Sequence, residues 1–236
     1  MSITKKRVAV LISGRGSNMK TLAEAAAGPR ATYEIVGVIS DKPEATGLNH
    51  AAALDIEGRA IPRKDFADKA AHEAAIDAQL KRWNVEIVAL AGYMRLLSAE
   101  FVETWKGRMI NIHPSLLPLF KGLDTHKRAL DGGLRIHGCT VHFVTAEMDG
   151  GPIIAQAAVP VSPDDNEDSL TRRVLAAEHQ LYPMALDLVA TGRAQLVSNR
   201  VAFDHLGASS GRERILSPST GHDGEADLES LARFTP

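Results

Sequence analysis

The first 113 residues alternate between short apolar runs and segments with helical spacing. In the longest such segment Ile76, Leu80 and Trp83 recur at i, i+4 and i+7. The pattern predicts strands at 7–12, 33–40, 59–61, 85–92 and 109–113, and helices at 17–27, 48–54, 65–83 and 98–105. Strands that alternate with helices indicate βαβ units, so we expect an α/β fold built on a mostly parallel sheet flanked by helices.

The pattern changes after Asp131. The apolar runs "CTVHFVT" and "IIAQAAVPV" are separated only by the turn-rich loop "AEMDGGP", which predicts an antiparallel extension of the sheet in the C-terminal half. A helix is expected from about Ser169, with Asp168 as its N-cap and Pro183 kinking or dividing it. We expect residues 1–200 to form a single domain and the polar, turn-rich residues 201–236 to form an extended or partly disordered tail.

Composition narrows the possible partners. The net charge is −2 and aromatic residues make up 5% of the chain, which disfavours nucleic acid and anionic membranes as partners. A single cysteine excludes an intrachain disulfide and a cysteine-based zinc site. The apolar run near the N-terminus is too short for a signal peptide, and no run approaches the ~20 apolar residues of a membrane span. We therefore expect a cytoplasmic protein that acts on small molecules.

The loop "SGRGSN" connects the first predicted strand to the first predicted helix. Backbone N–H groups and the helix dipole at such a junction favour an anion. The dinucleotide pattern G-x-G-x-x-G fails because Met19 follows where a glycine is needed, and no Gly-Lys-Ser/Thr completes a Walker pattern. The loop is therefore either a site for one phosphate, with Ser17 and Asn18 as donors, or a tight turn in which Ser17 caps the helix.

Two polar residues, Asn111 and His113, end the apolar strand "MINIH". Side chains alternate along a strand, so this pair faces one side while Ile110 and Ile112 face the other. Open α/β sheets bind their ligands at the carboxyl ends of parallel strands, and Pro114 fixes the backbone at this end. We interpret the pair as functional.

Asp149, in the loop "EMDGGP", supplies a carboxylate that can join this pair. Asn111 and a protonated His113 can donate to the oxyanion of a tetrahedral intermediate. Asp149 can hold His113 protonated and accept a proton from an attacking amine, directly or through water. These roles fit acyl transfer to an amine without a serine or cysteine nucleophile. The alternative for Asp149 is an Asx turn with the backbone near Gly151.

Histidines offer a rival interpretation, a metal site. Its ligands would be His113, His126, His137, His142 and Asp149. None of these histidines belongs to a tight ligand motif such as H-E-x-x-H, so we expect no metal. Cys139 alternates with apolar neighbours and is expected to be a small buried residue.

Five segments occur in a characteristic order over about residues 7–200: "SGRGSN", "AGYMRLLS", "NIHPSLLP", "GCTVHFVTAEMDGGPII" and "AAEHQLYP". Together they resemble the phosphoribosylglycinamide formyltransferases, the folate-dependent glycinamide ribonucleotide (GAR) transformylases of purine synthesis. "NIHPSLLP" is typical of the wider formyltransferase superfamily, and the glycine loop and "AAEHQLYP" point to this member.

The resemblance implies a Rossmann-like sheet that binds substrate phosphate with its N-terminal half, about 1–105, and folate with a catalytic half, about 106–200. It implies transfer of the formyl group of 10-formyltetrahydrofolate, a co-substrate, to the amine of GAR by direct amine attack. It implies no metal, and a monomer or a homodimer.

The resemblance also implies roles for individual residues. The catalytic set is Asn111, His113 and Asp149. The GAR-binding set is Gly16, Ser17, Asn18, Pro114 and Glu178. The folate-binding set is Lys69, Tyr93, Met94, Arg95, Leu96, Leu97, Asn111, Val144, Thr145, Ala146, Glu147, Met148 and Asp149. Taken alone, Glu178 fits a solvent-facing helical position, and Leu96 and Leu97 fit a core.

The sequence departs from the family pattern at two positions. Lys69, with Arg63 and Lys64 nearby, stands where an arginine is frequent, and lysine lacks the forked geometry of the guanidinium. Asp124 stands where a histidine is common in "GLHTH", while His126 is kept.

Three alternatives stay open at this point. A formyltetrahydrofolate deformylase shares the catalytic set but needs no phosphate loop, and it carries a further N-terminal domain. A methionyl-tRNA formyltransferase needs a basic C-terminal domain, which residues 201–236 do not supply. A non-catalytic binding module would bind nucleotide or folate without turnover.

Overall fold

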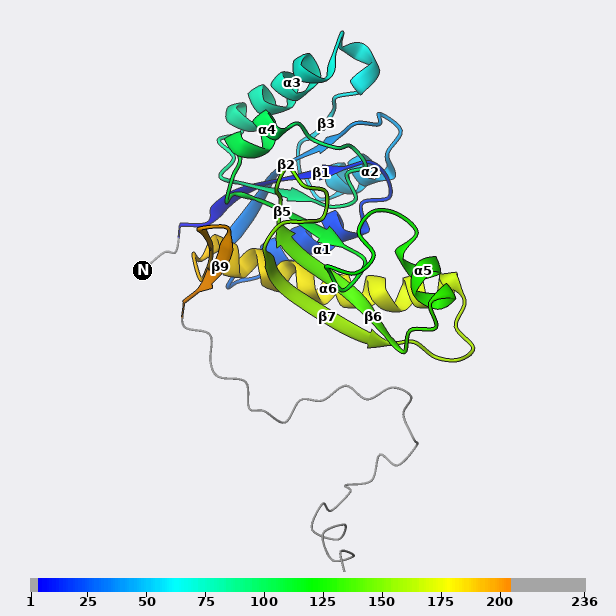
Figure 1. The fold of residues 1–236 in the computed structure, drawn as a ribbon. Helices are drawn as coiled ribbons and strands as arrows, with labels where there is room; N and C mark the ends of the chain where they lie inside the picture. Colours follow the sequence, from blue (N-terminus) through cyan, green and yellow to red (C-terminus); the bar gives the residue numbers. More distant parts are fainter. Residues whose placement is uncertain (1–3, 205–236) are drawn as a thin grey trace, which may run out of the picture.

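The computed structural model describes residues 4–204 and contains a seven-stranded sheet in the order β3-β2-β1-β4-β5-β6-β7 (Figure 1). The strands are β1 (Lys6–Ile12), β2 (Tyr33–Ser40), β3 (Gly58–Ala60), β4 (Ile87–Leu90), β5 (Met109–His113), β6 (Ile136–Phe143) and β7 (Ile153–Pro160). Pairing is parallel from β3 to β5 and antiparallel from β5 to β7. This arrangement confirms the predicted fold class, including the antiparallel extension.

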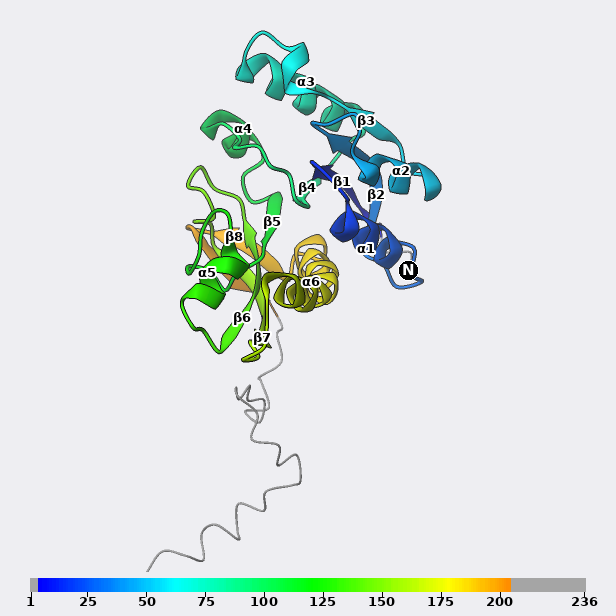
Figure 2. The same ribbon diagram turned by 90° about the vertical axis from the view of Figure 1, so that its right-hand side faces the viewer.

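Helices cover both faces of the sheet (Figures 1 and 2). They are α1 (Ser17–Ala26), α2 (Thr46–Ala53), α3 (Lys69–Arg82), α4 (Ala99–Thr104), α5 (Thr125–Asp131) and α6 (Glu167–Ala190), with a 3₁₀ turn at Arg63–Asp65. Side chains of α1, α2, α5 and α6 pack in one apolar cluster, and those of α3 and α4 pack in a second. Alternate side chains of the central strands pack into the two clusters, one on each face of the sheet. Because both faces are buried, the sequences of these strands are continuous apolar runs.

The strand order places a topological switch between β1 and β4. The chain leaves β1 towards β2 and β3, then returns to add β4 on the opposite side of β1. Crossovers that diverge in this way leave a crevice at the carboxyl ends of the two strands, where α/β proteins bind ligands. The glycine loop follows β1 and "AGYMRLLS" follows β4, so both motifs lie at this crevice, with β5 next to them.

Several local predictions need correction. Helix α3 begins at Lys69 rather than near 65, because Asp68 accepts a capping hydrogen bond from the Ala71 amide. Asn166, rather than Asp168, caps α6, through a reciprocal capping box with Ser169.

Pro183 does not divide α6, which runs unbroken for 24 residues. Buried Leu181, Tyr182, Ala185 and Leu186 on either side of Pro183 pack this helix against the sheet. This packing offsets the hydrogen bond that proline cannot donate.

A short hairpin, β8 (Ala194–Val197) with β9 (Arg200–Phe203), is not anticipated by the sequence analysis. It extends past the predicted boundary at residue 200, and the rest of the predicted tail, 205–236, lies outside the described residues. Helix α5 is likewise not anticipated.

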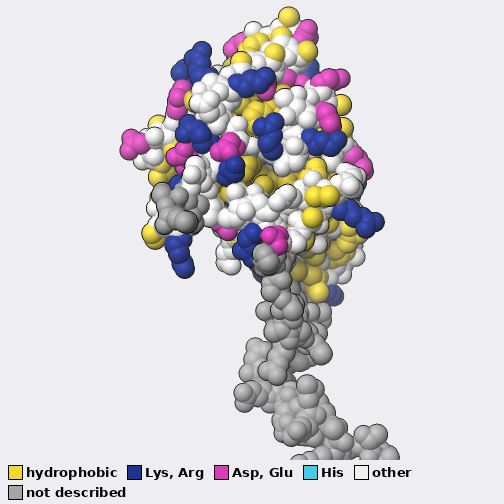
Figure 3. Space-filling view, turned by 90° about the vertical axis from the view of Figure 1, so that its left-hand side faces the viewer, with side chains coloured by type: hydrophobic (Ala, Val, Ile, Leu, Met, Phe, Trp, Pro, Cys, Tyr) yellow, Lys and Arg dark blue, Asp and Glu magenta, His cyan; other side chains and the backbone are white. Residues whose placement is uncertain are grey.

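Charged side chains of both signs lie on the molecular face that Figure 3 draws. On the face drawn in Figure 3, acidic and basic side chains are interspersed, so neither sign dominates it. Among residues 4–204 no helix is long and apolar enough to cross a membrane.

The hydroxyl of fully buried Tyr182 ties α6 to the switch region. It donates to the Leu90 carbonyl at the end of β4 over 2.9 Å and lies 3.4 Å from the carbonyl of Ile110, the second residue of β5. Tyr93 is also buried, but its hydroxyl has no hydrogen-bond partner in the described part of the chain.

These two tyrosines give a matched test. Tyr182→Phe removes the buried hydrogen bond to the Leu90 carbonyl and should lower the free energy of unfolding by about 0.5–1.5 kcal/mol. Tyr93→Phe removes an unpaired polar group and should leave stability unchanged or raise it. Urea unfolding of both variants measures the difference, and equal losses in the two would contradict the assignment.

Candidate active site

Asn111 and His113 lie on one face of β5, as predicted, and Ile110 and Ile112 pack into the cluster beneath α6. The His113 Nδ1 atom is 3.4 Å from Asp149 Oδ2, so the structure brings the histidine and the aspartate together. Asn111 reaches the same group through His142, whose Nε2 is 3.2 Å from Asn111 Nδ2 and 3.9 Å from Asp149 Oδ1. The three predicted catalytic side chains therefore form one cluster with a fourth member.

Hydrogen bonding determines where the protons of His113 lie. Its Nε2 is 2.9 Å from the Phe120 carbonyl, which only accepts, so Nε2 carries a hydrogen. In the neutral ring, Nδ1 would then point a lone pair at the Asp149 carboxylate. A ring that also carried a hydrogen on Nδ1 would instead form an ion pair with the carboxylate.

Asp149 is held by a distant part of the chain rather than by an Asx turn with its neighbours. Its Oδ2 accepts from the Gly122 amide over 2.9 Å, whereas Oδ1 makes no hydrogen bond within residues 4–204. Oδ1 is thus the oxygen available to take a proton.

Thr140, directly opposite His113 in β6, anchors the segment that follows β5. Its hydroxyl donates to the Ser115 carbonyl over 2.7 Å and accepts from the Leu117 amide over 3.0 Å. These bonds, with Pro114, fix the chain where it leaves the strand.

Gly16 makes the glycine loop possible. It is the N-cap of α1 with φ 72°, and an added Cβ would lie 2.7 Å from the Gly47 Cα at the start of α2. Ser17 is the first helical residue and no side chain caps α1, so the capping role considered for Ser17 is wrong. The first helical hydrogen bond runs from Lys20 to Gly16, which leaves the preceding amides free for an anion.

Glu178 lies close to this loop, and its predicted alternative as a solvent-facing residue is wrong. It is 6% exposed and accepts from Asn18 Nδ2 over 2.7 Å. Burial raises the pKa of Glu178, and the hydrogen bond from Asn18 partly opposes that rise. Asn18 Oδ1 is buried and has no hydrogen-bond partner among residues 4–204.

The segment "YMRLL" shows a division between buried and exposed side chains. Tyr93 is buried, while Met94 and Leu96 are each 68% exposed, which corrects the core interpretation of Leu96. Leu97 is partly buried and packs on the second cluster, as a core residue would. Arg95 is held by buried Asp41, with Nε 2.6 Å from Oδ2.

The remaining candidate folate residues lie on two elements. Lys69, at the start of α3, has its Nζ 3.9 Å from Glu73 Oε1. In the loop after β6, Val144 and Thr145 are partly exposed and Ala146 through Met148 are exposed. Glu147 pairs with Lys121 over 2.6 Å.

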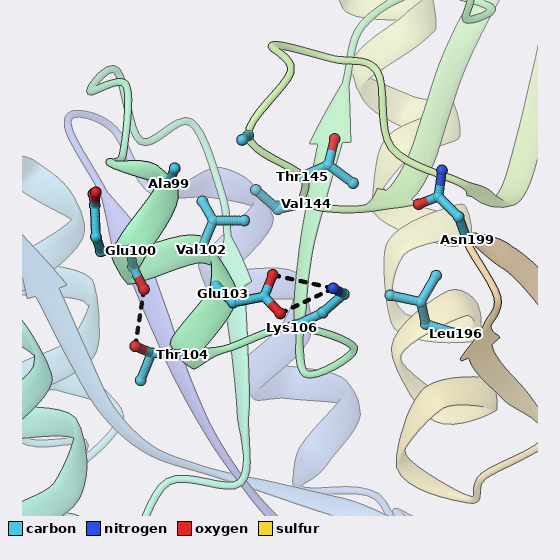
Figure 4. A pocket seen from close by; sticks show the side chains of 11 residues that line it. Ala99, Glu100, Val102, Glu103, Thr104, Lys106, Val144, Thr145, Leu196 and Asn199 are labelled. Carbon is cyan, nitrogen blue, oxygen red and sulfur yellow. Dashed lines mark hydrogen bonds and ion pairs between the residues drawn. The ribbon is translucent and has the colours of Figure 1, made fainter.

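Two cavities flank this loop. The larger, about 760 Å³, lies between Val144–Ala146, α4 and the β8–β9 hairpin, with Val102 beside Val144 and Asn199 on the opposite side (Figure 4). The smaller, about 390 Å³, includes Asp149. Neither cavity is lined by Asn111 or His113.

Histidines outside the cluster show packing rather than ligand geometry. The rings of His126 and His137 meet edge to face with centroids 5.3 Å apart. Burial lowers the pKa of His137 to about 4. No group of three or more potential ligands within the described range is arranged to hold a metal. Cys139 is fully buried, as predicted.

The fold and this cluster define an α/β protein with an Asn-His-Asp group at the carboxyl end of a central strand. A family model described as formyl transferase matches residues 6–186. The chain therefore belongs to the formyl transferase family.

Three relatives show which members of this family the chain is similar to. Phosphoribosylglycinamide formyltransferase of Escherichia coli is 40% identical over 84% of this chain and 93% of its own length. The trifunctional purine biosynthetic protein adenosine-3 of Homo sapiens is 47% identical over 83% of this chain, which spans only 19% of that protein. A solved phosphoribosylglycinamide formyltransferase from Brucella melitensis is 56% identical with a TM-score of 0.78, covering 80% of this chain and 97% of that one.

Burial of Glu178 makes stability depend on pH. Because its pKa is raised in the folded protein, the folded state binds the proton more tightly than the unfolded chain. This group therefore lowers stability increasingly as pH rises from the ordinary glutamate range through the raised pKa. Glu178→Gln, which keeps an acceptor for Asn18, should raise Tm at pH 8 and have little effect near pH 4.

Thermal melts of the wild type and the variant at both pH values measure this effect. Glu24→Gln is the control, since that carboxylate is exposed on α1, where it pairs with Lys20. A Tm gain for Glu178→Gln that is the same at pH 4 and pH 8 would contradict the linkage to Glu178.

Proposed function

We propose that this protein transfers the formyl group of 10-formyltetrahydrofolate to the amine of glycinamide ribonucleotide. The observation that carries the proposal is the contact between His113 and Asp149, beside Asn111, at the carboxyl end of β5. The E. coli and B. melitensis relatives, named as phosphoribosylglycinamide formyltransferases, support it. The open amides at the start of α1 add support, because they suit a substrate that carries one phosphate.

Chemistry at the cluster follows from its hydrogen bonds. The GAR amine attacks the formyl carbon, and the carbonyl oxygen becomes an oxyanion. Asn111 donates an N–H to that oxygen. A protonated His113 can add its Nδ1–H, because Asp149 Oδ2 at 3.4 Å lies beyond an ordinary N–H···O bond and leaves this hydrogen without a strong acceptor.

Proton balance assigns a role to Asp149. The attacking nitrogen loses one proton, and Asp149 Oδ1 is the acceptor that its environment leaves open. When the intermediate collapses, the bond between the formyl carbon and N10 of the folate breaks, and N10 takes up one proton. The same proton can pass from Asp149 to N10, so the site returns to its starting state.

Binding groups extend from this centre in two directions. The glycine loop with Gly16, Ser17 and Asn18 would hold the phosphate of GAR, and Glu178 would bind its ribose or glycinamide end. Pro114 would contact GAR beside the catalytic strand. The segments 93–97 and 144–149, with Lys69, would line the folate site.

A turnover assay tests the proposal. The full chain is mixed with 10-formyltetrahydrofolate, with and without GAR, and loss of the formyl group is followed optically. We expect loss only when GAR is present. Formyl loss without GAR would support a deformylase, and ligand binding without any loss would support a non-catalytic module.

Asp149→Asn tests the proton acceptor. We expect kcat to fall by about 10²–10⁴-fold, the usual contribution of general acid–base catalysis, while GAR still binds. Asp164→Asn is the matched control, because Asp164 is exposed in the loop before α6. Steady-state measurement of kcat for both variants tests this expectation. Full activity of Asp149→Asn would show that Asp149 is not the proton acceptor.

A further inference from the structure

His142 stands directly opposite Asn111 in the antiparallel pair of β5 and β6. It is 2% exposed, and the sequence analysis assigns it no catalytic role. Its Nε2 lies 3.2 Å from Asn111 Nδ2, and its Nδ1 lies 2.9 Å from the Phe143 carbonyl. Both ring nitrogens are therefore engaged, one with a backbone acceptor and one with a catalytic side chain.

The backbone contact decides which nitrogen carries hydrogen. A carbonyl oxygen only accepts, so Nδ1 must be the N–H, and in a neutral ring Nε2 must then be a bare acceptor. Burial lowers the pKa of His142, which favours the neutral ring. The bare Nε2 accepts one hydrogen from the Asn111 amide nitrogen.

Charged and titratable neighbours do not reverse this conclusion. Asp149 favours a charged ring, but its Oδ1 is 3.9 Å from Nε2, beyond a direct hydrogen bond. His113 and Lys121 both oppose a positive charge on His142.

Gly151 leaves room for this arrangement. An added Cβ at position 151 would lie 1.7 Å from the Phe143 carbonyl oxygen and 3.2 Å from His142 Nδ1. A side chain there would displace the carbonyl that holds the ring. Gly151 thus keeps the Phe143 carbonyl where it can accept from His142.

We propose that His142 is a positioning residue that orients the Asn111 carboxamide. By accepting one N–H, Nε2 fixes the amide nitrogen, rather than the amide oxygen, on the side of Asp149 and His113. The second N–H is then directed to the forming oxyanion. Without this acceptor the amide can rotate and present its oxygen, which would repel the oxyanion. This role rests on the proposed formyl transfer, whereas the proton arrangement does not.

Two variants separate acceptor chemistry from packing. His142→Gln can place Oε1 near the position of Nε2 and keep an acceptor, whereas His142→Leu fills similar space without one. We expect His142→Leu to lower kcat by at least tenfold, with KM for GAR within about twofold of wild type, and His142→Gln to recover most of the loss. Equal activity of the two variants, high or low, would overturn the proposal, and thermal melts check that both are folded.

A spectroscopic measurement on the full chain needs no turnover. Imidazole ¹⁵N shifts of His142 at neutral pH should show a protonated Nδ1 and a bare Nε2, and the Asn111 side-chain amide signals should shift in His142→Leu but less in His142→Gln. A protonated Nε2 would overturn the proposal even in an active enzyme. If the wild type shows the expected shifts but no formyl transfer, the proposed function fails while the Asn111–His142 contact stands.

Discussion

The antiparallel pairing of β6 with β5 is the constraint on which the candidate site depends. It sets His142 opposite Asn111 and Thr140 opposite His113. The loop that returns from β6 to β7 then brings Asp149 back to the same strand end. A parallel neighbour would need a long crossover, which would carry the chain away from this end. Reversal of direction at β6 therefore assembles a site from residues close in space along two adjacent strands and one short loop.

Sequence periodicity predicts the parts of this molecule that depend on local pattern. The apolar runs mark the parallel strands, and strand alternation correctly puts Asn111 and His113 on one face. It does not predict the register of β5 against β6, so His142 is placed only among possible metal ligands. In a simple hairpin, residues at equal distances from the turn lie opposite each other, and this rule would pair Asn111 with His142. Here β5 and β6 are joined by a long segment that contains α5, so the register cannot be counted from a turn. The sequence pattern also fails to predict the β8–β9 hairpin, because its strands are only four residues long and partly exposed, so they form no clear apolar run.

A buried ionisable side chain distinguishes the start of α1, where the phosphate of GAR is proposed to bind, from the apolar core. Glu178 is buried against Asn18 at a cost in stability, and the unpaired Asn18 oxygen adds to that cost. A core under no other constraint would place apolar residues there. Polar groups that are buried and incompletely satisfied in the free protein are suited to bind a polar ligand, because the ligand supplies the missing partners. Lys69 is less suited to such binding, because its side chain is exposed to water and already lies near Glu73.

Backbone strain lies at the same place as the chemistry. Phe120 and Asp149 both have positive φ, 55° and 49°, a conformation that costs non-glycine residues on the order of 1 kcal/mol. Glycine would remove the strain at 149 but would also remove the carboxylate that meets His113. At 120 the group that contacts His113 is the carbonyl, and the ring contributes separately by packing beneath Arg128, 5.1 Å away. The two strained residues hold His113 from opposite nitrogens, so relaxing either one would release the imidazole from the orientation that the proposed transfer needs.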